Sequence, residues 1–281
     1  MIFVAVMLLG LLWNHWSFLL LFSIIHFGCW FEYLRLLELI HKQTLPRLAQ
    51  FGFMVGGYAI VISACAAPYL VGDYWLKQIF FLPLALAGFI LLALAIGRSA
   101  AVNPKLYAQA TLGFLYISLS LSLLIRMRMH MVFYSPMGIV DNGRIFPLLL
   151  IATIWINDTM QYIVGSLIGK TPFSKISPKK TWEGTIGGIV LATLAVGLYA
   201  MKYVEDGWSA LPAFLLPACI AIAGTAGDLL ESFIKRRAGV KDSGSMLPGH
   251  GGFLDRFDSL LIATPIAWLI MVLMFMGIFG H

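Results

Sequence analysis

The stretch KQIFFLPLALAGFILLALAIG, from Lys77 to Gly97, carries no charged residue after its first position. A helix rises about 1.5 Å per residue, so a stretch of this length can cross the roughly 30 Å apolar core of a bilayer. Because such uncharged runs are typical of transmembrane helices, this stretch predicts a membrane protein.

Similar apolar stretches occur along the whole chain, at residues 17–40, 50–72, 106–125, 145–169, 186–203, 210–236 and 257–279. The run from Met1 to Trp13 is a further candidate, although its helix would reach only about 20 Å. We therefore expect an all-α integral membrane protein, a polytopic bundle of about nine transmembrane helices with a polar cavity that faces the cytoplasm.

The composition agrees with this fold class. Of the 281 residues, 60% are hydrophobic and 11% are charged, whereas soluble domains average about 45–50% and about 25%. The net charge of +6 would suggest nucleic acid in a soluble protein. In a membrane protein it indicates basic loops near anionic lipids, so we expect membrane lipids and no nucleic acid as partners.

The polar residues divide a single membrane domain, residues 1–281, into two halves. Residues 1–155 are mainly apolar and are expected to form scaffold helices, whereas residues 156–281 repeatedly place charges beside apolar stretches and are expected to carry the chemistry. Basic residues gather in alternate loops, with Arg126, Arg128 and Arg144 as exceptions. This bias predicts a multi-pass plasma (inner) membrane protein whose active site faces the cytoplasm, with an organelle membrane as the alternative.

The helix predicted at 210–236 has one polar face. Asp228, Glu231, Ser232 and Lys235 follow one another at offsets of 0, 3, 4 and 7, which places them on the same side. Inserting a carboxylate into the membrane within a helix costs roughly 2.5 to 3.5 kcal/mol, and this cost favours a functional role for Asp228. The alternative is structural: an ion pair between Glu231 and Lys235, with Asp228 bonded to a neighbouring helix.

The last predicted helix opens with a second acidic face, which Asp255 and Asp258 share. Acidic residues in a first turn also stabilise the helix start, and that alone could explain them. The loop before this helix is short, so the two acidic helices should be antiparallel neighbours. Mg²⁺ characteristically takes one or two protein carboxylates together with substrate phosphates, and the two faces therefore predict a Mg²⁺ site.

Two loops carry features of an anion site. In residues 241–252, Gly251 and Gly252 leave backbone amides bare before a helix start, which favours an anion, although a plain turn also uses glycines. In residues 170–184, Ser177 and Pro178 can begin a helix whose first turn presents Lys179 and Lys180 to an anionic ligand. The alternative is a lysine-rich loop that only follows the orientation rule.

The segment GSLIGKT, from Gly165 to Thr171, looks like a phosphate-binding P-loop but has three residues between its glycines where four are required. We interpret Gly165 and Gly169 as a contact between helices. Asp158 is a candidate for the periphery of the site, with a structural hydrogen bond as an equal alternative.

The segment SFIKRRAGVKDSGSMLPGHGGFLDRFD, from Ser232 to Asp258, resembles the signature of the phosphatidate cytidylyltransferases, or CDP-diacylglycerol synthases. The loop SPKKTWEG, which begins at Ser177, and several residues from Asp158 to Gly169 are also similar to that family, whereas the first half agrees only as a hydrophobic bundle. One departure is Gln161, where the family has a small residue.

The resemblance implies a membrane enzyme that condenses CTP with phosphatidic acid to CDP-diacylglycerol and pyrophosphate, and that requires Mg²⁺, with a second cation left open. On this basis we expect Asp228 and Asp255 to bind the metal, with Asp258 and Glu231 as further ligands. The expected catalytic residues are Asp228, Asp255, Lys179 and Lys180. The expected substrate-binding residues are Ser177, Lys179, Lys180, Ser232, Lys235, Arg236, Lys241, His250, Gly251, Gly252 and Arg256.

Three questions stay open at this point. A CTP-dependent membrane lipid kinase would share the nucleotide-binding lysines and acids. A cation-coupled transporter would also place acids on facing helices, although such sites tend to lie near the midplane between related halves. A homodimer is compatible with the sequence, which does not determine the oligomeric state.

Overall fold

The computed structural model describes residues 2–66, 68–98, 103–129, 132–135, 138–141, 143–174, 176–203, 209–246 and 251–276. The chain packs as two compact units. The first comprises Met1–Phe146 and Arg237–Phe257, and the second comprises Pro147–Arg236 and Asp258–His281.

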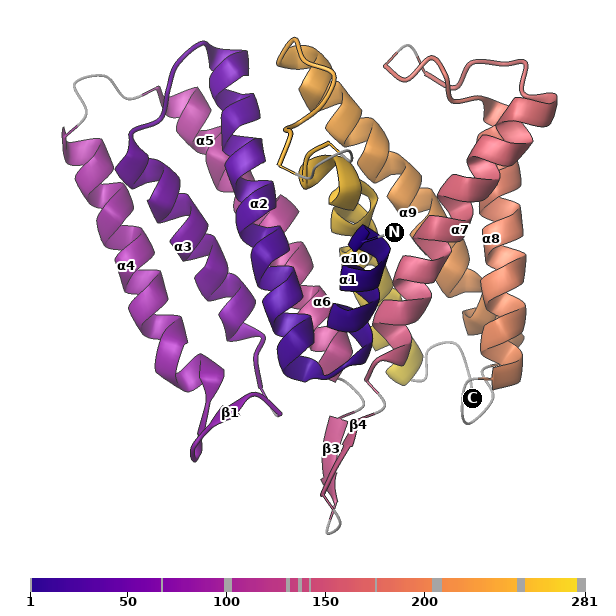
Figure 1. The fold of residues 1–281 in the computed structure, drawn as a ribbon, viewed down its shortest axis with the longest axis horizontal. Coiled ribbons are helices and arrows are strands. Elements are labelled where there is room, and N and C mark those ends of the chain that lie inside the picture. The colour runs from indigo at the N-terminus through magenta and orange to yellow at the C-terminus, as the bar shows by residue number, and fades with distance from the viewer. Residues whose placement is uncertain are drawn as a thin grey trace. The chain divides into compact units, whose positions relative to one another are not determined.

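The first unit is built mainly from the N-terminal helices (Figure 1). These are α1 (Ile2–Leu12), α2 (His15–His41), α3 (Arg47–Ser63), α4 (Leu76–Arg98), α5 (Pro104–Gly113), the π-helical turn η1 (Phe114–Leu119) and α6 (Ser120–Met129). Two short antiparallel hairpins complete it, β1 (Leu70–Val71) with β2 (Tyr74–Trp75) and β3 (Val132–Ser135) with β4 (Gly138–Asp141).

Helix α2 is held firmly in the first unit. Its first turn is closed by a capping box in which Asn14 accepts from the amide of Ser17 and the Ser17 hydroxyl accepts from the amide of Asn14. Further along, the buried indole of Trp30 donates to Ser118 Oγ at 2.9 Å and stacks on Phe53. Satisfied polar groups and aromatic packing of this kind fix the rotation of the helix.

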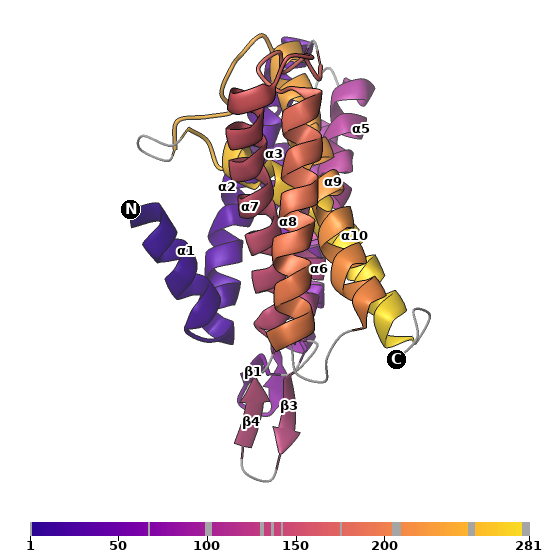
Figure 2. The ribbon, with the colours of Figure 1, turned by 90° about the vertical axis from the view of Figure 1, so that its right-hand side faces the viewer.

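The second unit contains most of α7 (Ile145–Ile168) and α9 (Ala210–Arg237), all of α8 (Trp182–Tyr203), and α10 (Leu254–Phe275) from Asp258 onward. Figure 2 shows α7 and α8 side by side. Their contact uses small residues, because a Cβ on Gly184 would lie 2.9 Å from the Cα of Gly165. This confirms the helix contact predicted at Gly165, and close approach at small residues is the usual packing of membrane helices.

Within the described part of the chain, seven helices are long and apolar enough to cross a membrane: α2, α4, the continuous segment α5–η1–α6, α7, α8, α9 and α10. Helix α3 has 17 residues and α1 has 11, which is short of the roughly 20 that a span requires. The described residues thus form a multi-pass, helical membrane protein, and the count of nine spans and the polar cavity stay predictions.

One helix end predicted from the sequence is wrong. The span predicted at 50–72 ends as a helix at Ser63, and its last residues lead into the β1–β2 hairpin. Pro68 and the left-handed Gly72, with a φ of 62°, explain the break, because proline stops a helix and glycine favours a turn. The hairpins themselves were not predicted, since apolar periodicity does not resolve such short strands.

Candidate active site

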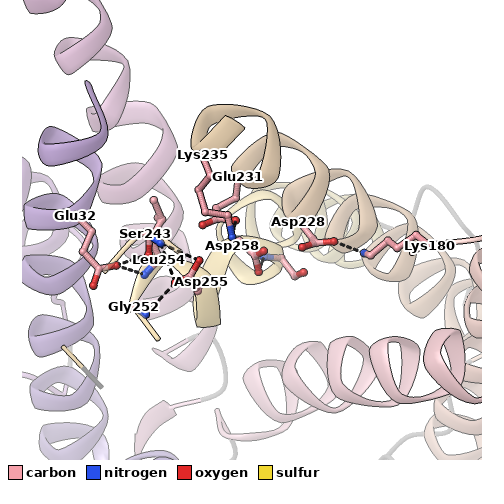
Figure 3. A network of polar contacts seen from close by, with 11 residues as sticks. Glu32, Lys180, Asp228, Glu231, Lys235, Ser243, Gly252, Leu254, Asp255 and Asp258 are labelled. Carbon is pink, nitrogen blue, oxygen red and sulfur yellow. Dashed lines mark hydrogen bonds and ion pairs between the residues drawn. The ribbon is translucent and has the colours of Figure 1, made fainter. Parts of the chain in front are cut away.

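Acidic and basic side chains meet in the second unit where α8 begins and α9 approaches its end. The ammonium group of Lys180 forms an ion pair with the carboxylate of Asp228, and Figure 3 shows the two side chains pointing toward each other. The carboxyl groups of Asp158, Asp228 and Asp258 lie close enough for their charges to interact. The structure therefore brings three carboxylates and one lysine together.

Glycine at position 227 makes this cluster possible. A Cβ there would lie 2.6 Å from the carbonyl oxygen of Asp258 and 3.0 Å from the Cα of Ser259. Only a residue without a side chain lets the backbones of α9 and α10 approach so closely. Asp258 is buried, with 7% of its surface exposed, so the approach of the two helices sets its position beside Asp228.

The loop before α8 holds Lys180 in place. Pro178 occupies the second position of a turn in which the Lys180 amide donates to the carbonyl of Ser177 at 3.1 Å, as proline favours. The Phe173 amide then donates to the Lys180 carbonyl at 2.8 Å. The loop is therefore ordered by its own backbone bonds.

Glu183, just past the end of the same loop, is hydrogen-bonded to the residues at its beginning. Its carboxylate accepts hydrogen bonds from the amides of Lys170 and Thr171 and from the Thr171 hydroxyl. The indole of Trp182 packs against Phe173, with ring centroids 4.5 Å apart. Glu183 was not singled out from the sequence, because a glutamate in a first helical turn is explained by the helix dipole alone.

The predicted helix start at Ser177 and Pro178 is wrong. Helix α8 begins at Trp182, and the Thr181 hydroxyl accepts from the amide of Gly184 at 3.1 Å. Threonine is a preferred N-cap residue, so it sets the boundary. Lys179 and Lys180 consequently lie in the preceding loop rather than in the first helical turn.

Glu231 and Lys235 form an ion pair one turn apart on α9. Glu231 is fully buried, and a buried carboxylate requires such a partner. This is the structural arrangement considered from the sequence, and a role of Glu231 as a metal ligand stays a prediction. On the same helix Ser232 is half-buried.

A second set of polar contacts lies in the first unit, around the loop that leads into α10 (Figure 3). The Asp255 carboxylate accepts from the Ser243 amide at 3.0 Å and from the Gly252 amide at 2.9 Å. The Glu32 carboxylate accepts from the Ser243 hydroxyl at 2.7 Å and from the Leu254 amide at 2.8 Å. Of the bare amides predicted before this helix, that of Gly252 therefore binds a carboxylate of the protein itself.

The other predicted site residues differ in their exposure to solvent. Four basic residues are exposed: Lys179, Arg236, Lys241 and Arg256. Ser177 and Lys235 are half-buried. Gly251 has a φ of 82°, a conformation that favours glycine. His250 lies outside the described residues, as does Lys175 of the lysine-rich loop. The phosphate-binding roles of all these residues stay predictions.

Gln161, the departure from the family pattern, lies on α7 and contacts two other helices of the second unit. Its amide nitrogen donates to Thr225 Oγ1 at 2.8 Å, and a Cβ on Gly188 would meet its side chain. The longer residue thus takes part in the packing of α7 against α8 and α9.

The donor chemistry of the clusters fits Mg²⁺. Among the described residues there is no group of three or more His, Cys, Asp or Glu side chains arranged as a metal cage. Mg²⁺ does not require one, because it usually binds through one or two carboxylates and leaves other positions to water and substrate phosphates. Asp228 and Asp258 provide carboxylate oxygens of that kind.

Long apolar helices and polar clusters at loop and helix ends define a multi-pass membrane protein with a charged site. The family model described as "Cytidylyltransferase family" matches residues 1–274 of the chain. The chain belongs to this family.

Individual relatives carry more specific names. The chain is 46% identical over 125 residues to "Phosphatidate cytidylyltransferase" of Aquifex aeolicus, covering 44% of this chain and 46% of that protein. It is 42% identical over 133 residues to the protein of the same name from Synechocystis, covering 47% and 45%. The chain thus spans about half the length of these two relatives.

A longer match involves "Phosphatidate cytidylyltransferase" of Staphylococcus haemolyticus. The two are 31% identical over 238 residues, which covers 84% of this chain and 85% of that protein. This match therefore extends over most of both chains.

Proposed function

We propose that this chain is a phosphatidate cytidylyltransferase that condenses CTP with phosphatidic acid, giving CDP-diacylglycerol and pyrophosphate. The observation that carries the proposal is the ion pair of Lys180 with Asp228 beside Asp258. Lys180 and Asp258 come from the two segments that resemble the family, and Asp228 lies four residues before the second of them. Family membership and the names of the relatives support the same activity.

The main difficulty of this reaction is repulsion between anions. A phosphate monoester has a second pKa of about 6, so the lipid phosphate is largely dianionic at neutral pH and its attacking oxygen needs little help from a base. It must nevertheless approach the α-phosphorus of a negatively charged triphosphate. The residues of the site therefore have to neutralise and align phosphates rather than remove a proton.

Lys180 is suited to bind one of these phosphates. Its ammonium group already interacts with an anion, the Asp228 carboxylate, and 24% of its side chain is exposed. A phosphate oxygen can replace that carboxylate as its partner when substrate binds. Lys179, Lys235, Arg236, Lys241 and Arg256 would hold the remaining charge, with Ser177, Ser232, His250, Gly251 and Gly252 as further contacts.

Asp228 and Asp255 would hold Mg²⁺, with Asp258 and Glu231 as further ligands. Asp255 and Asp258 are three residues apart on α10, which places them on the same side of that helix. When bound, Mg²⁺ would neutralise phosphate charge and stabilise the departing pyrophosphate. Asp228 would hold the metal, whereas Lys180, its ion-pair partner, would hold a phosphate.

The distribution of basic residues supports a particular membrane and orientation. We propose that the protein lies in the plasma (inner) membrane with its site at the cytoplasmic face, where CTP is available. The basic residues at the C-terminal end of α9 and in the loop before α8 support this orientation. A homodimer is compatible with the proposal and is not required by it.

The test is product formation by the purified protein. Wild-type protein supplied with CTP, phosphatidic acid and Mg²⁺ should form a lipid that migrates as CDP-diacylglycerol, and a chelator should abolish it until Mg²⁺ is restored. Asp255→Asn should lose most turnover. Near wild-type turnover of this variant at saturating Mg²⁺ would remove Asp255 from the ligand set, and absence of the product from the wild-type protein would refute the function.

A further inference from the structure

Glu32, in α2, is a fully buried carboxylate that binds the start of α10. Its Oε2 accepts from Ser243 Oγ at 2.7 Å and from the Leu254 amide at 2.8 Å, and its Oε1 accepts from the Phe253 amide at 3.0 Å. All these groups belong to the first unit. A residue of the expected scaffold therefore contacts the segment that resembles the family signature.

This contact lies deep along a membrane helix. Glu32 comes nine residues before His41, the last residue of α2, which is about 14 Å along the helix axis. Non-helical backbone at such a depth must have its polar groups satisfied by protein or water. Because α10 begins at Leu254, Glu32 satisfies two of the amides that every helix start leaves without a partner.

The surface of α2 is shaped to receive this segment. A Cβ on Gly28, one turn before Glu32, would lie 2.5 Å from the ring of Phe253. A Cβ on Gly244 or on Gly252 would meet the Glu32 carboxylate itself. Glycine at these positions lets the loop and α2 approach closely, so the contact depends on sequence features of both segments.

Ser243 connects Glu32 to Asp255. Its hydroxyl donates to Glu32, whereas its amide donates to Asp255. The Gly252 amide, next to the amides that Glu32 binds, also donates to Asp255, at the same Oδ2 oxygen that accepts from Ser243. The backbone that orients Asp255 is therefore the same backbone that Glu32 holds. A carboxylate has about four acceptor directions, so these bonds are compatible with metal coordination.

We propose that Glu32 is a positioning residue for the reaction: from α2 it fixes the start of α10 and thereby orients Asp255 toward Mg²⁺. This inference rests on the proposed function for the role of Asp255, whereas the anchoring of the loop stands on the hydrogen bonds themselves. Removing residues that orient metal ligands typically lowers metal affinity or activity about 10- to 100-fold.

The variant Glu32→Gln tests the contribution of the negative charge and of the second acceptor oxygen of Glu32. Glutamine keeps the size of the side chain but has one acceptor oxygen, and its amide nitrogen would face a backbone N–H instead of accepting from it. The matched control is Glu38→Gln on the same helix. Glu38 also accepts from a backbone amide, that of Leu45 at 2.7 Å, and from the side chain of Gln50. Both of these partners lie outside the segment at 243–254.

The first readout is independent of activity. Amide hydrogen exchange in peptides that cover residues 243–254 should accelerate about tenfold or more in Glu32→Gln and should not change in Glu38→Gln. The second readout is the Mg²⁺ concentration for half-maximal turnover, which should rise about tenfold in Glu32→Gln while the KM for CTP changes less. Glu38→Gln should leave both kinetic constants as in the wild type.

Unchanged exchange at 243–254 in folded Glu32→Gln would overturn the anchor, and an unchanged Mg²⁺ requirement would overturn the positioning role. If this variant does not fold, Ser243→Ala provides the same test, because it removes only the hydroxyl bond to Glu32. It should shift the Mg²⁺ requirement in the same direction by a smaller factor, and no shift would overturn the role. If the wild-type protein makes no CDP-diacylglycerol, the proposed function fails, and the exchange experiment still decides whether Glu32 anchors the loop.

Discussion

Lys180 forms an ion pair with Asp228, and about a quarter of each side chain is exposed, 24% and 26%. An ion pair with this accessibility can be opened by a ligand without unfolding the loop or the helix that carry it. A phosphate would bind to the ammonium group of Lys180, and a metal ion would bind to the carboxylate of Asp228. The pair thus joins the two kinds of residue that the proposed reaction needs.

Replacing this lysine tests its role as a phosphate ligand. Lys180→Met should lower kcat for CDP-diacylglycerol formation by about 100-fold, because a preorganised charge that stabilises the reacting phosphates is lost. Lys202→Met, at the other end of α8 and near the ring of Tyr203, is the control and should keep wild-type turnover. Equal activity of the two variants would exclude Lys180 from the site.

The close approach of α9 and α10 at Gly227 gives a second prediction. In Gly227→Ala the new Cβ would crowd the backbone of Asp258. Such overpacking lowers the free energy of unfolding by about 1 to 3 kcal/mol and displaces the helix. We expect a lower midpoint of thermal unfolding and at least a tenfold loss of turnover. Gly97→Ala is the matched control, because no atom of the residues that the structure describes lies within 4 Å of a Cβ at that position. If both variants behave alike, the packing at Gly227 does not set the position of Asp258.

Glu183 gives a third prediction, on the order of the lysine loop. Glu183→Gln removes one acceptor oxygen from a carboxylate that binds both Lys170 and Thr171. The bonds are exposed, so we expect a moderate effect: a several-fold higher KM for CTP, a smaller change in kcat, and faster proteolysis within residues 169–181. Unchanged proteolysis would show that Glu183 does not order the loop.

The helices were predictable from the sequence where uncharged runs are long. The stretch at 77–97 became α4 almost without change, because twenty apolar residues leave few alternatives to a membrane helix. The shared face of Asp228, Glu231 and Lys235 also followed from helical spacing. The start of α8 was missed by several residues, since several residues of that loop can cap a helix and tertiary contacts select Thr181.

Contacts between distant segments were not predictable in this way. The partner of Asp228 is a lysine 48 residues earlier in the chain, and periodicity does not relate the two positions. The sequence gives one indication for Glu32, because it is a carboxylate within the apolar stretch at 17–40. Burying a carboxylate in a membrane helix without a partner is energetically costly. Its partners are 211 to 222 residues away, so only the folded chain reveals that it binds the loop before α10.

The position of the radiolabel that CTP transfers to lipid tests the central claim most directly. With phosphatidic acid and Mg²⁺, label at the α-phosphate of CTP should enter the lipid product of the wild-type protein, and Asp228→Asn should reduce this incorporation by about 100-fold or more. Label at the γ-phosphate should remain in pyrophosphate. Incorporation of γ-label into lipid, with none of the α-label, would contradict cytidylyl transfer and identify a lipid kinase.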